Sequence, residues 1–239
     1  MRLLIIRHGD PDYEKDCLTE KGKKEAALLA EYLKDENIHA VYSSPLGRAK
    51  ETCRFVTQKK GLSYEEKDWL REFNYGVNLP SGYKANPWDF MPAFWSEKKE
   101  LYTEEWLYSD IFKNTDTPTR YAFVCKSLDE LLEKHGYKRD GKNYRVMRAN
   151  RDTVALFCHF GIESVLLSHL FSVSPVVLLQ HTCALTTSVT TLYTEERERG
   201  IAAFRMCGFG DLSHLALGKE LPSFSARFCE TFDCKEERH

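Results

Sequence analysis

The feature that most constrains the fold is an apolar run at the start of the chain that ends in reactive side chains. Residues 3–6, Leu-Leu-Ile-Ile, are followed at once by Arg7, His8 and Gly9. A short leucine and isoleucine run bounded by turn formers is typical of a strand buried on both faces, as in a parallel sheet. Because ligands bind at the carboxyl ends of such strands, Arg7 and His8 are candidates for chemistry, although an ordinary strand exit has the same pattern.

The same layout recurs late in the chain. The apolar residues 153–158 are followed by His159 and Gly161, and a helical pattern covers about 162–171. Two buried strands that each end in a histidine are harder to explain by packing than one. We therefore expect His8 and His159 to meet at one edge of the sheet.

Between these two strands the pattern predicts a β-α-β unit followed by a second helix. Thr19 is a candidate N-cap for a helix that ends near 35–37, and residues 40–42 form the next predicted strand. Ser44 and Pro45 then predict a cap and first turn. Arg48 would lie in that first turn, where a helix N-terminus and a guanidinium group together suit an anion.

The segment after this helix introduces a carboxylate among aromatic residues. Glu72 lies between Trp69 and Tyr75, and a desolvated glutamate has a raised pKa that suits it to donate a proton. From about 77 to 150 the pattern is irregular and aromatic, with a helix predicted at about 119–135. We expect an insertion over the carboxyl end of the strands, whose aromatics either cover the site or pack a subsidiary core.

The remaining pattern and the composition limit the possible classes of protein. Two late strands are expected at 188–193 and 202–206, with a turn around Gly200 and a loop at 208–215. The 239 residues suit a single domain, and a net charge of -2 does not suggest nucleic-acid binding. No run has the length of a signal-peptide core or membrane span, which predicts a cytoplasmic protein. The eight cysteines form no C-x-x-C pair and are expected to be reduced.

Taken in order, these motifs resemble the histidine phosphatase superfamily, which has the phosphoglycerate mutase-like fold. The matching positions are Arg7-His8-Gly9, Leu18-Thr19 with Gly22, Ser43-Ser44-Pro45 with Arg48, Glu72, His159 with Gly161, and Gly210-Asp211 with Ser213-His214-Leu215. The resemblance covers 1–76 and 153–171 well, 201–217 less closely, and the insertion not at all.

The resemblance implies a three-layer α/β/α sandwich with a mostly parallel sheet and a phosphohistidine mechanism. His8 would attack phosphorus, Arg7 and Arg48 would hold the phosphoryl oxygens, and His159 would add a donor. Glu72 would protonate the departing alkoxide and then activate water. This scheme needs no metal or other cofactor, and the expected partner is a small phosphorylated molecule.

Two departures from the family pattern bear on the reaction. Residues 10–14 are Asp-Pro-Asp-Tyr-Glu, where many members continue with Glu-Thr and then an asparagine. Phosphoglycerate mutases have Glu-Arg-His-Tyr-Gly where this chain has Glu72-Phe73-Asn74-Tyr75-Gly76, and losing that arginine favours hydrolysis over transfer. A phosphatase is the first hypothesis, with a mutase and a non-catalytic regulatory relative as alternatives.

Overall fold

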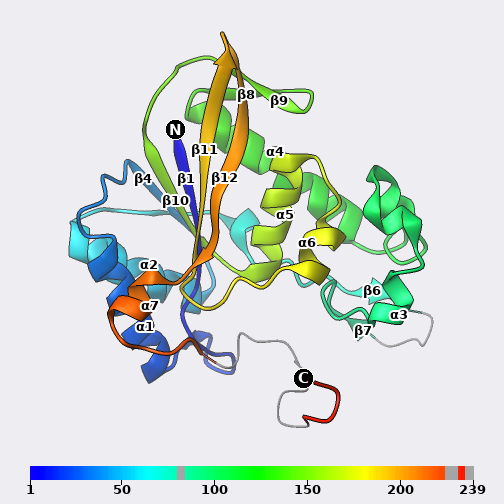
Figure 1. The fold of residues 1–239 in the computed structure, drawn as a ribbon, viewed down its shortest axis with the longest axis horizontal. Helices are drawn as coiled ribbons and strands as arrows, with labels where there is room; N and C mark the ends of the chain where they lie inside the picture. The colour runs from blue at the N-terminus through cyan, green and yellow to red at the C-terminus, as the bar shows by residue number, and fades with distance from the viewer. Residues whose placement is uncertain (80–83, 224–230, 235–239) are drawn as a thin grey trace.

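The centre of the molecule is an eight-stranded sheet that runs in the order β5-β4-β10-β1-β11-β12-β9-β8 (Figure 1). The computed structural model describes residues 1–79, 84–223 and 231–234. β5, β4, β10 and β1 are mutually parallel, and the remaining strands continue the sheet in antiparallel pairs. The strands are β1 (Arg2–Arg7), β4 (Ala40–Ser43), β5 (Glu65–Glu66), β8 (Tyr137–Asp140), β9 (Asn143–Val146), β10 (Thr153–Cys158), β11 (Val189–Glu198) and β12 (Ile201–Asp211).

Helices cover both faces of this sheet. α1 (Glu20–Tyr32) and α2 (Gly47–Lys60) lie on one face, with the short α7 (Ser213–Leu217) against α1. α4 (Thr117–Lys134) and α5 (Phe160–Phe171) lie on the other, and α6 (Pro175–His181) follows α5. The expected three-layer α/β fold with helices on both faces is confirmed.

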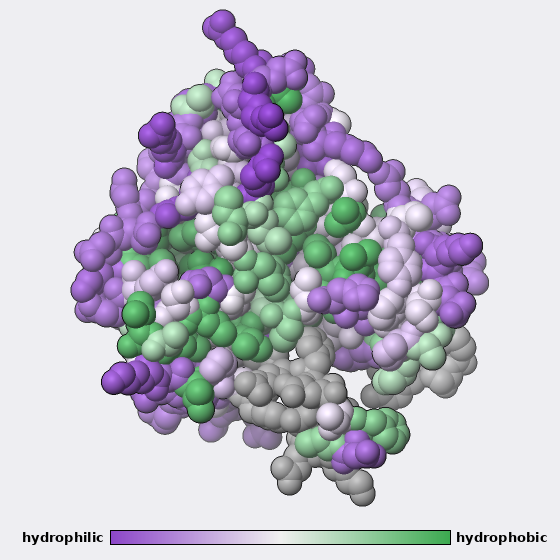
Figure 2. All heavy atoms as spheres, in the orientation of Figure 1, coloured by the Kyte–Doolittle hydropathy of each residue, from purple (hydrophilic) through white to green (hydrophobic). Residues whose placement is uncertain are grey.

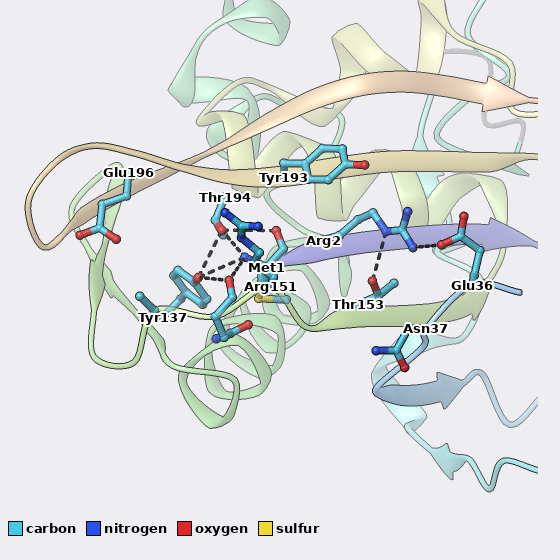
Figure 3. Close-up of a pocket in the computed structure, with 12 residues that line it drawn as sticks. Met1, Arg2, Glu36, Asn37, Tyr137, Arg151, Thr153, Tyr193, Thr194 and Glu196 are labelled. Atoms are coloured by element: carbon cyan, nitrogen blue, oxygen red, sulfur yellow. Dashed lines mark hydrogen bonds and ion pairs between the residues drawn. The ribbon is translucent and has the colours of Figure 1, made fainter.

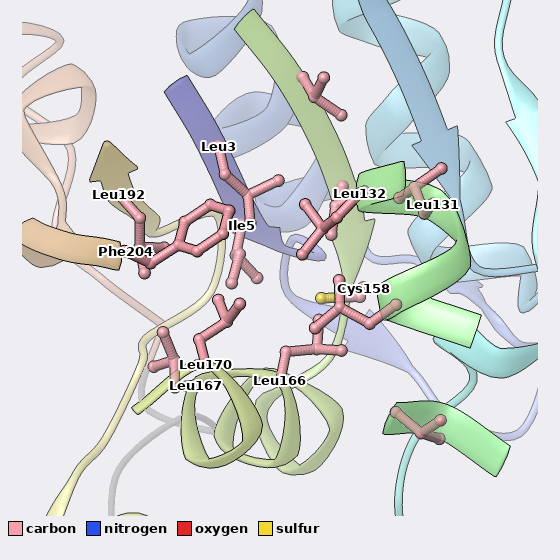
Figure 4. Packing of buried hydrophobic residues seen from close by; sticks show 14 of the residues in the cluster. Leu3, Ile5, Leu131, Leu132, Cys158, Leu166, Leu167, Leu170, Leu192 and Phe204 are labelled. Carbon is pink, nitrogen blue, oxygen red and sulfur yellow. The ribbon is translucent and has the colours of Figure 1, made fainter. Parts of the chain in front are cut away.

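Successive side chains of β1 point to opposite faces of the sheet, so this one strand contributes to the hydrophobic core on each face. Leu3 and Ile5 point toward α4 and α5, whereas Leu4 and Ile6 point toward α1 and α2. Figure 4 shows Leu3 and Ile5 packed with leucines from α4 and α5. Leu3, Ile5 and Ile6 are 0% exposed, so each contributes about 1.5–3 kcal/mol through burial. This buried strand is a rigid support for the two residues that follow it, Arg7 and His8.

The expected insertion at 77–150 divides into two parts. Its later part belongs to the sandwich, since Leu128 and Leu132 of α4 join the core and β9 pairs with β12. Its earlier part forms a separate cluster around Phe90, Trp106 and Phe112. This part contains β6 (Val77–Asn78), β7 (Lys84–Ala85), α3 (Pro92–Trp95) and the short 3-10 helices η2 (Lys99–Tyr102) and η3 (Glu104–Tyr108). Residues 80–83 of the expected insertion lie outside the described residues.

Several predicted boundaries need correction. α1 ends at Tyr32, short of the expected 35–37, because the backbone N–H of Leu33 already closes the last turn. α5 begins at Phe160 and α4 spans Thr117–Lys134. The late hairpin is confirmed but longer than expected, and the loop predicted at 208–215 is instead the end of β12 followed by α7. The N-cap role of Thr19 is confirmed by its bond from the Gly22 N–H at 3.0 Å.

The surface varies in character over the face seen in Figure 2. Hydrophilic side chains cover the hairpin and the rim, whereas apolar residues gather over the middle, where β12 and α6 lie in the same view. Of the described helices, none combines the length and the hydrophobicity that crossing a bilayer requires. Six cysteines of the described ranges are free thiols, namely Cys17, Cys53, Cys125, Cys158, Cys207 and Cys234. Cys158 is 0% exposed, as expected of a core residue.

Candidate active site

The two histidines meet because their strands are adjacent, parallel and in register. Arg7 of β1 aligns with Cys158 of β10, so the residues that follow, His8 and His159, leave the sheet at the same level. Their ring centroids are 5.0 Å apart. The expectation that the sequence places both histidines at one edge of the sheet is confirmed.

The hydrogen bonds of His8 fix its tautomer. Nδ1 lies 2.7 Å from the carbonyl oxygen of Gly9, which can only accept, so Nδ1 carries the proton. Nε2 receives the Nε–H of Arg48 at 3.3 Å and therefore presents a lone pair. Burial, and then the nearby guanidinium groups of Arg7 and Arg48, hold the pKa of His8 well below its ordinary value. His8 is thus a neutral imidazole with an available Nε2 lone pair.

Arg48 is positioned by the start of α2. Its Nη1 donates to Asp16 Oδ1 at 2.6 Å, and Asp16 Oδ2 also accepts from the backbone N–H of Gly47 at 2.6 Å. The Tyr13 ring lies over the guanidinium group, 5.2 Å from its carbon. As expected, Arg48 lies in the first turn of the helix. The helix begins at Gly47 with Leu46 as its N-cap, so Ser44 is not the cap that the sequence predicted.

Ser44 instead supports the second histidine. Its hydroxyl lies 2.8 Å from Nε2 of His159 and also accepts from the backbone N–H of Leu46. Within the described residues, Nδ1 of His159 has no hydrogen-bond partner, although the ring is fully buried. Burial and the neighbouring His8, Arg48 and Arg7 hold the pKa of His159 well below its ordinary value. An unpaired buried nitrogen is costly, and this makes Nδ1 a candidate to bind a ligand.

Arg7 lies at the carboxyl end of β1 and is 8% exposed. Its Nη1 donates to the carbonyl oxygen of Ala184, and its Nε has no partner among the described residues. Its guanidinium carbon lies 5.9 Å from the centre of the Phe160 ring. The charge of Arg7 is therefore available to a bound anion.

Glu72 reaches the same place from the segment after η1 (Asp68–Leu70). Oε1 accepts the backbone N–H of Phe73 at 2.8 Å and that of Ile162, in the first turn of α5, at 3.1 Å. These two donors occupy Oε1, which leaves Oε2 to carry the acidic proton. Burial raises the pKa of Glu72, and the two N–H groups with Arg7 and Arg48 oppose that rise.

A cavity of about 560 Å³ borders two of these groups, since Arg48 and Glu72 form part of its wall. Arg7, His8 and His159 do not line it and are each less than a tenth exposed, but His8 contacts Arg48 and lies beside His159, and Arg7 is close to both His8 and Glu72. The other lining residues are Tyr13, Leu46, Arg71, Asn74, Tyr75, Asn86 and Trp88. The structure thus brings together all five residues singled out from the sequence.

A larger cavity, of about 710 Å³, lies at the opposite end of the strands (Figure 3). There the amino group of Met1 donates to Tyr137, Asn150 and Thr194, and Arg2 pairs with Glu36. Its described lining contains no histidine or cysteine. The two buried histidines, in contrast, lie at the carboxyl end of β1 and β10.

The sequence reasoning missed several supporting residues. Asp16 and Ser44 hold Arg48 and His159, but nothing in their local pattern identifies these long-range contacts. A Cβ on Gly9 would lie 2.8 Å from the carbonyl oxygen of Gly22, so glycine is needed where the loop crosses α1. In the described residues, no group of three or more His, Cys, Asp or Glu side chains could hold a metal ion.

Comparisons with known proteins identify what the chain is similar to. Residues 3–108 match the model of the histidine phosphatase superfamily (branch 1). The resemblance that the sequence motifs indicate is therefore confirmed over this range. Phosphoserine phosphatase 1 of Hydrogenobacter thermophilus is 30% identical over 86 residues, which are 32% of this chain and 41% of that protein. A probable phosphoglycerate mutase of Yersinia pestis is 30% identical over 86 residues, 32% of this chain and 40% of that protein. The match spans about two-fifths of the length of these relatives.

Solved structures extend the similarity to the fold of nearly the whole chain. A mycobacterial glucosyl-3-phosphoglycerate phosphatase superposes with a TM-score of 0.60 at 19% identity, covering 87% of this chain and 98% of its own. A phosphoserine phosphatase of Entamoeba histolytica, in complex with 3-phosphoglyceric acid, gives a TM-score of 0.59 at 17% identity, covering 90% and 98%. At these identities the comparison establishes the shared fold alone.

Proposed function

We propose that this protein is a metal-independent phosphatase that hydrolyses small phosphomonoesters through a phosphohistidine at His8. The observation that carries the proposal is the state of His8, whose Nε2 lone pair faces Arg48, with Arg7 and His159 close to the same ring. A phosphoryl group spreads charge over three oxygens during transfer, so catalysis depends on positioning and positive charge. Arg7 and Arg48 supply that charge.

The first step transfers the phosphoryl group to the enzyme. Arg48 exchanges its bond with Nε2 of His8 for bonds to the phosphoryl oxygens, and Arg7 and Nδ1 of His159 bind the remaining oxygens. Nε2 then attacks phosphorus in line with the leaving oxygen. As the P–O bond breaks, Oε2 of Glu72 gives its proton to the departing alkoxide.

The second step releases phosphate. Glu72, now ionised, takes a proton from a water molecule that attacks phosphorus. The N–P bond breaks and its electron pair returns to Nε2 of His8, so His8 and Glu72 recover their starting states. We also propose that the whole chain acts as one domain, since the segment before α4 contributes Asn86 and Trp88 to the cavity.

The remaining question is whether water or a second substrate takes the phosphoryl group. Relatives named as phosphatases and as mutases both match. The residue after Glu72 is Phe73, which is 2% exposed and cannot bind a second phosphate. This favours water as the acceptor.

The test is a product assay on the purified chain. With 3-phosphoglycerate and p-nitrophenyl phosphate as probes, we expect free phosphate from the wild type and none from His8→Ala. Undiminished turnover by His8→Ala would contradict the role of His8. Conversion of 3-phosphoglycerate to its 2-isomer with little free phosphate would establish the mutase instead.

A further inference from the structure

Trp88 is a residue of the insertion that lies beside the proposed catalytic groups. This side chain lines the cavity beside Glu72, and its ring lies at 6.2 Å from that of Phe160, at the start of α5. The other two tryptophans of the insertion have different surroundings: Trp106 packs in the separate aromatic cluster and Trp95 against His181. Trp88 is therefore the insertion residue placed to act on the catalytic carboxyl group.

The space around Gly161 shows how closely Trp88 and Glu72 approach each other. A Cβ on Gly161 would lie 2.5 Å from Cζ3 of Trp88 and 2.6 Å from Oε1 of Glu72. The two atoms are on the same side of the helix, and those values place them no more than about 5 Å apart. The indole ring and the carboxyl group thus both lie over the first turn of α5 at Gly161, where a Cβ would collide with both.

We propose that Trp88 is a positioning residue, which covers the carboxyl group of Glu72 and holds it against the first turn of α5 for proton transfer to the leaving group. The proposal rests on the phosphatase function proposed above. A carboxyl group against an indole ring loses contact with water, which favours its protonated form. Proton donation to an alkoxide requires that form.

The groups around Glu72 favour its ionised form, so the carboxyl group must be shielded from water if it is to stay protonated. Two backbone N–H groups and the guanidinium groups of Arg7 and Arg48 all favour the ionised carboxylate. The charge of Glu72 in turn raises the pKa of Glu163 on α5. Burial has the largest effect on the pKa of Glu72 and raises it, and Trp88 supplies apolar surface for that burial. The groups that face Glu72 from β1, α2, β10 and α5 are Arg7, Arg48, Cys158 and Glu163.

The proposal predicts a specific dependence on the leaving group. An alkoxide such as that of β-glycerophosphate needs a proton as it departs, whereas p-nitrophenolate departs without one. Trp88→Ala should therefore lose about tenfold more activity on β-glycerophosphate than on p-nitrophenyl phosphate. In addition, the pH at which kcat/KM on β-glycerophosphate falls on the alkaline side should move down by about one unit.

Three variants complete the experiment. Trp88→Phe keeps an aromatic ring near the carboxyl group and should recover most of the alkaline shift. Trp95→Ala removes a tryptophan that does not line the cavity and should leave both the profile and the substrate ratio unchanged. Glu72→Gln has neither the acidic proton nor the base for the second step, so it should show the full preference for p-nitrophenyl phosphate in the leaving group released in the first turnover.

The experiment distinguishes a failure of the role proposed for Trp88 from a failure of the proposed phosphatase function. Equal losses on the two esters, or an alkaline limb that Trp88→Ala leaves in place, would overturn the role of Trp88. If the wild type hydrolyses neither ester, the proposed function fails. In that case the protonation of Glu72 can be followed against pH through the 13C chemical shift of its carboxyl carbon, in the wild type and in Trp88→Ala. This tests whether Trp88 shields the carboxyl group, and it requires no turnover. An unchanged titration would overturn it.

Discussion

Replacing Arg48 with lysine tests whether the site needs a guanidinium group or only a positive charge. Arg48 contacts Asp16 through Nη1 and His8 through Nε, and it is 9% exposed. A lysine has one ammonium group on a flexible stem and cannot occupy both positions. The change keeps the charge but removes the fork that would hold two phosphoryl oxygens.

The losses of activity and of stability expected for Arg48→Lys follow from the two contacts of Arg48 considered separately. Losing one preorganised donor to a transition-state oxygen costs about 100-fold in rate, or about 2.7 kcal/mol. The ion pair with Asp16 contributes less to stability, since Asp16 is 41% exposed and water screens it, so we expect about 1 kcal/mol there. Arg48→Lys should therefore be far more damaging to activity than to folding.

The assay measures kcat/KM for p-nitrophenyl phosphate together with urea unfolding. Asp16→Asn is the matched control, because it loosens Arg48 without removing it and should cost only about tenfold in rate. If Arg48→Lys retains activity within about threefold of the wild type, a point charge suffices and the bidentate argument is wrong.

Two further substitutions test the buried polar groups. Ser44→Ala leaves Nε2 of His159 without its partner, which should lower stability by about 1–3 kcal/mol in urea unfolding, and an unchanged midpoint would contradict this. Burial raises the pKa of Glu163 to about 7, so the native state holds a proton that the unfolded chain releases above pH 4.5. Native stability therefore falls as pH rises from 4.5 to about 7. Glu163→Gln should be more stable than the wild type by about 3 kcal/mol at pH 8, with the gain disappearing toward pH 4.5.

The sequence was most informative where local pattern and topology agree. Residues 3–6 and 154–158 are apolar throughout because both faces of a central strand are buried, and parallel pairing then brings His8 and His159 to the same level. Arg48 could be placed because helix starts carry local signals. These rules depend on neighbouring residues and on strand direction, which a sequence displays directly.

Contacts between distant segments could not be predicted in the same way. Ser44 carries a cap pattern, yet its hydroxyl binds His159, 115 residues away. The boundary of the insertion was misplaced because amphipathic patterns at 117–146 do not say which surface they cover, and α4 covers the sheet. The role of Trp88 depends on the space above Gly161, which only the folded chain defines.

The most direct test of the account is the detection of phosphate on His8. Glu72→Gln can accept the phosphoryl group from p-nitrophenyl phosphate, but it lacks the base that activates water, so the intermediate should accumulate. We expect mass spectrometry of the rapidly quenched variant to find one phosphate per chain, on His8, labile to acid and absent from Glu72→Gln/His8→Ala. Phosphate on another residue, or turnover without any phosphate on His8, would contradict the account.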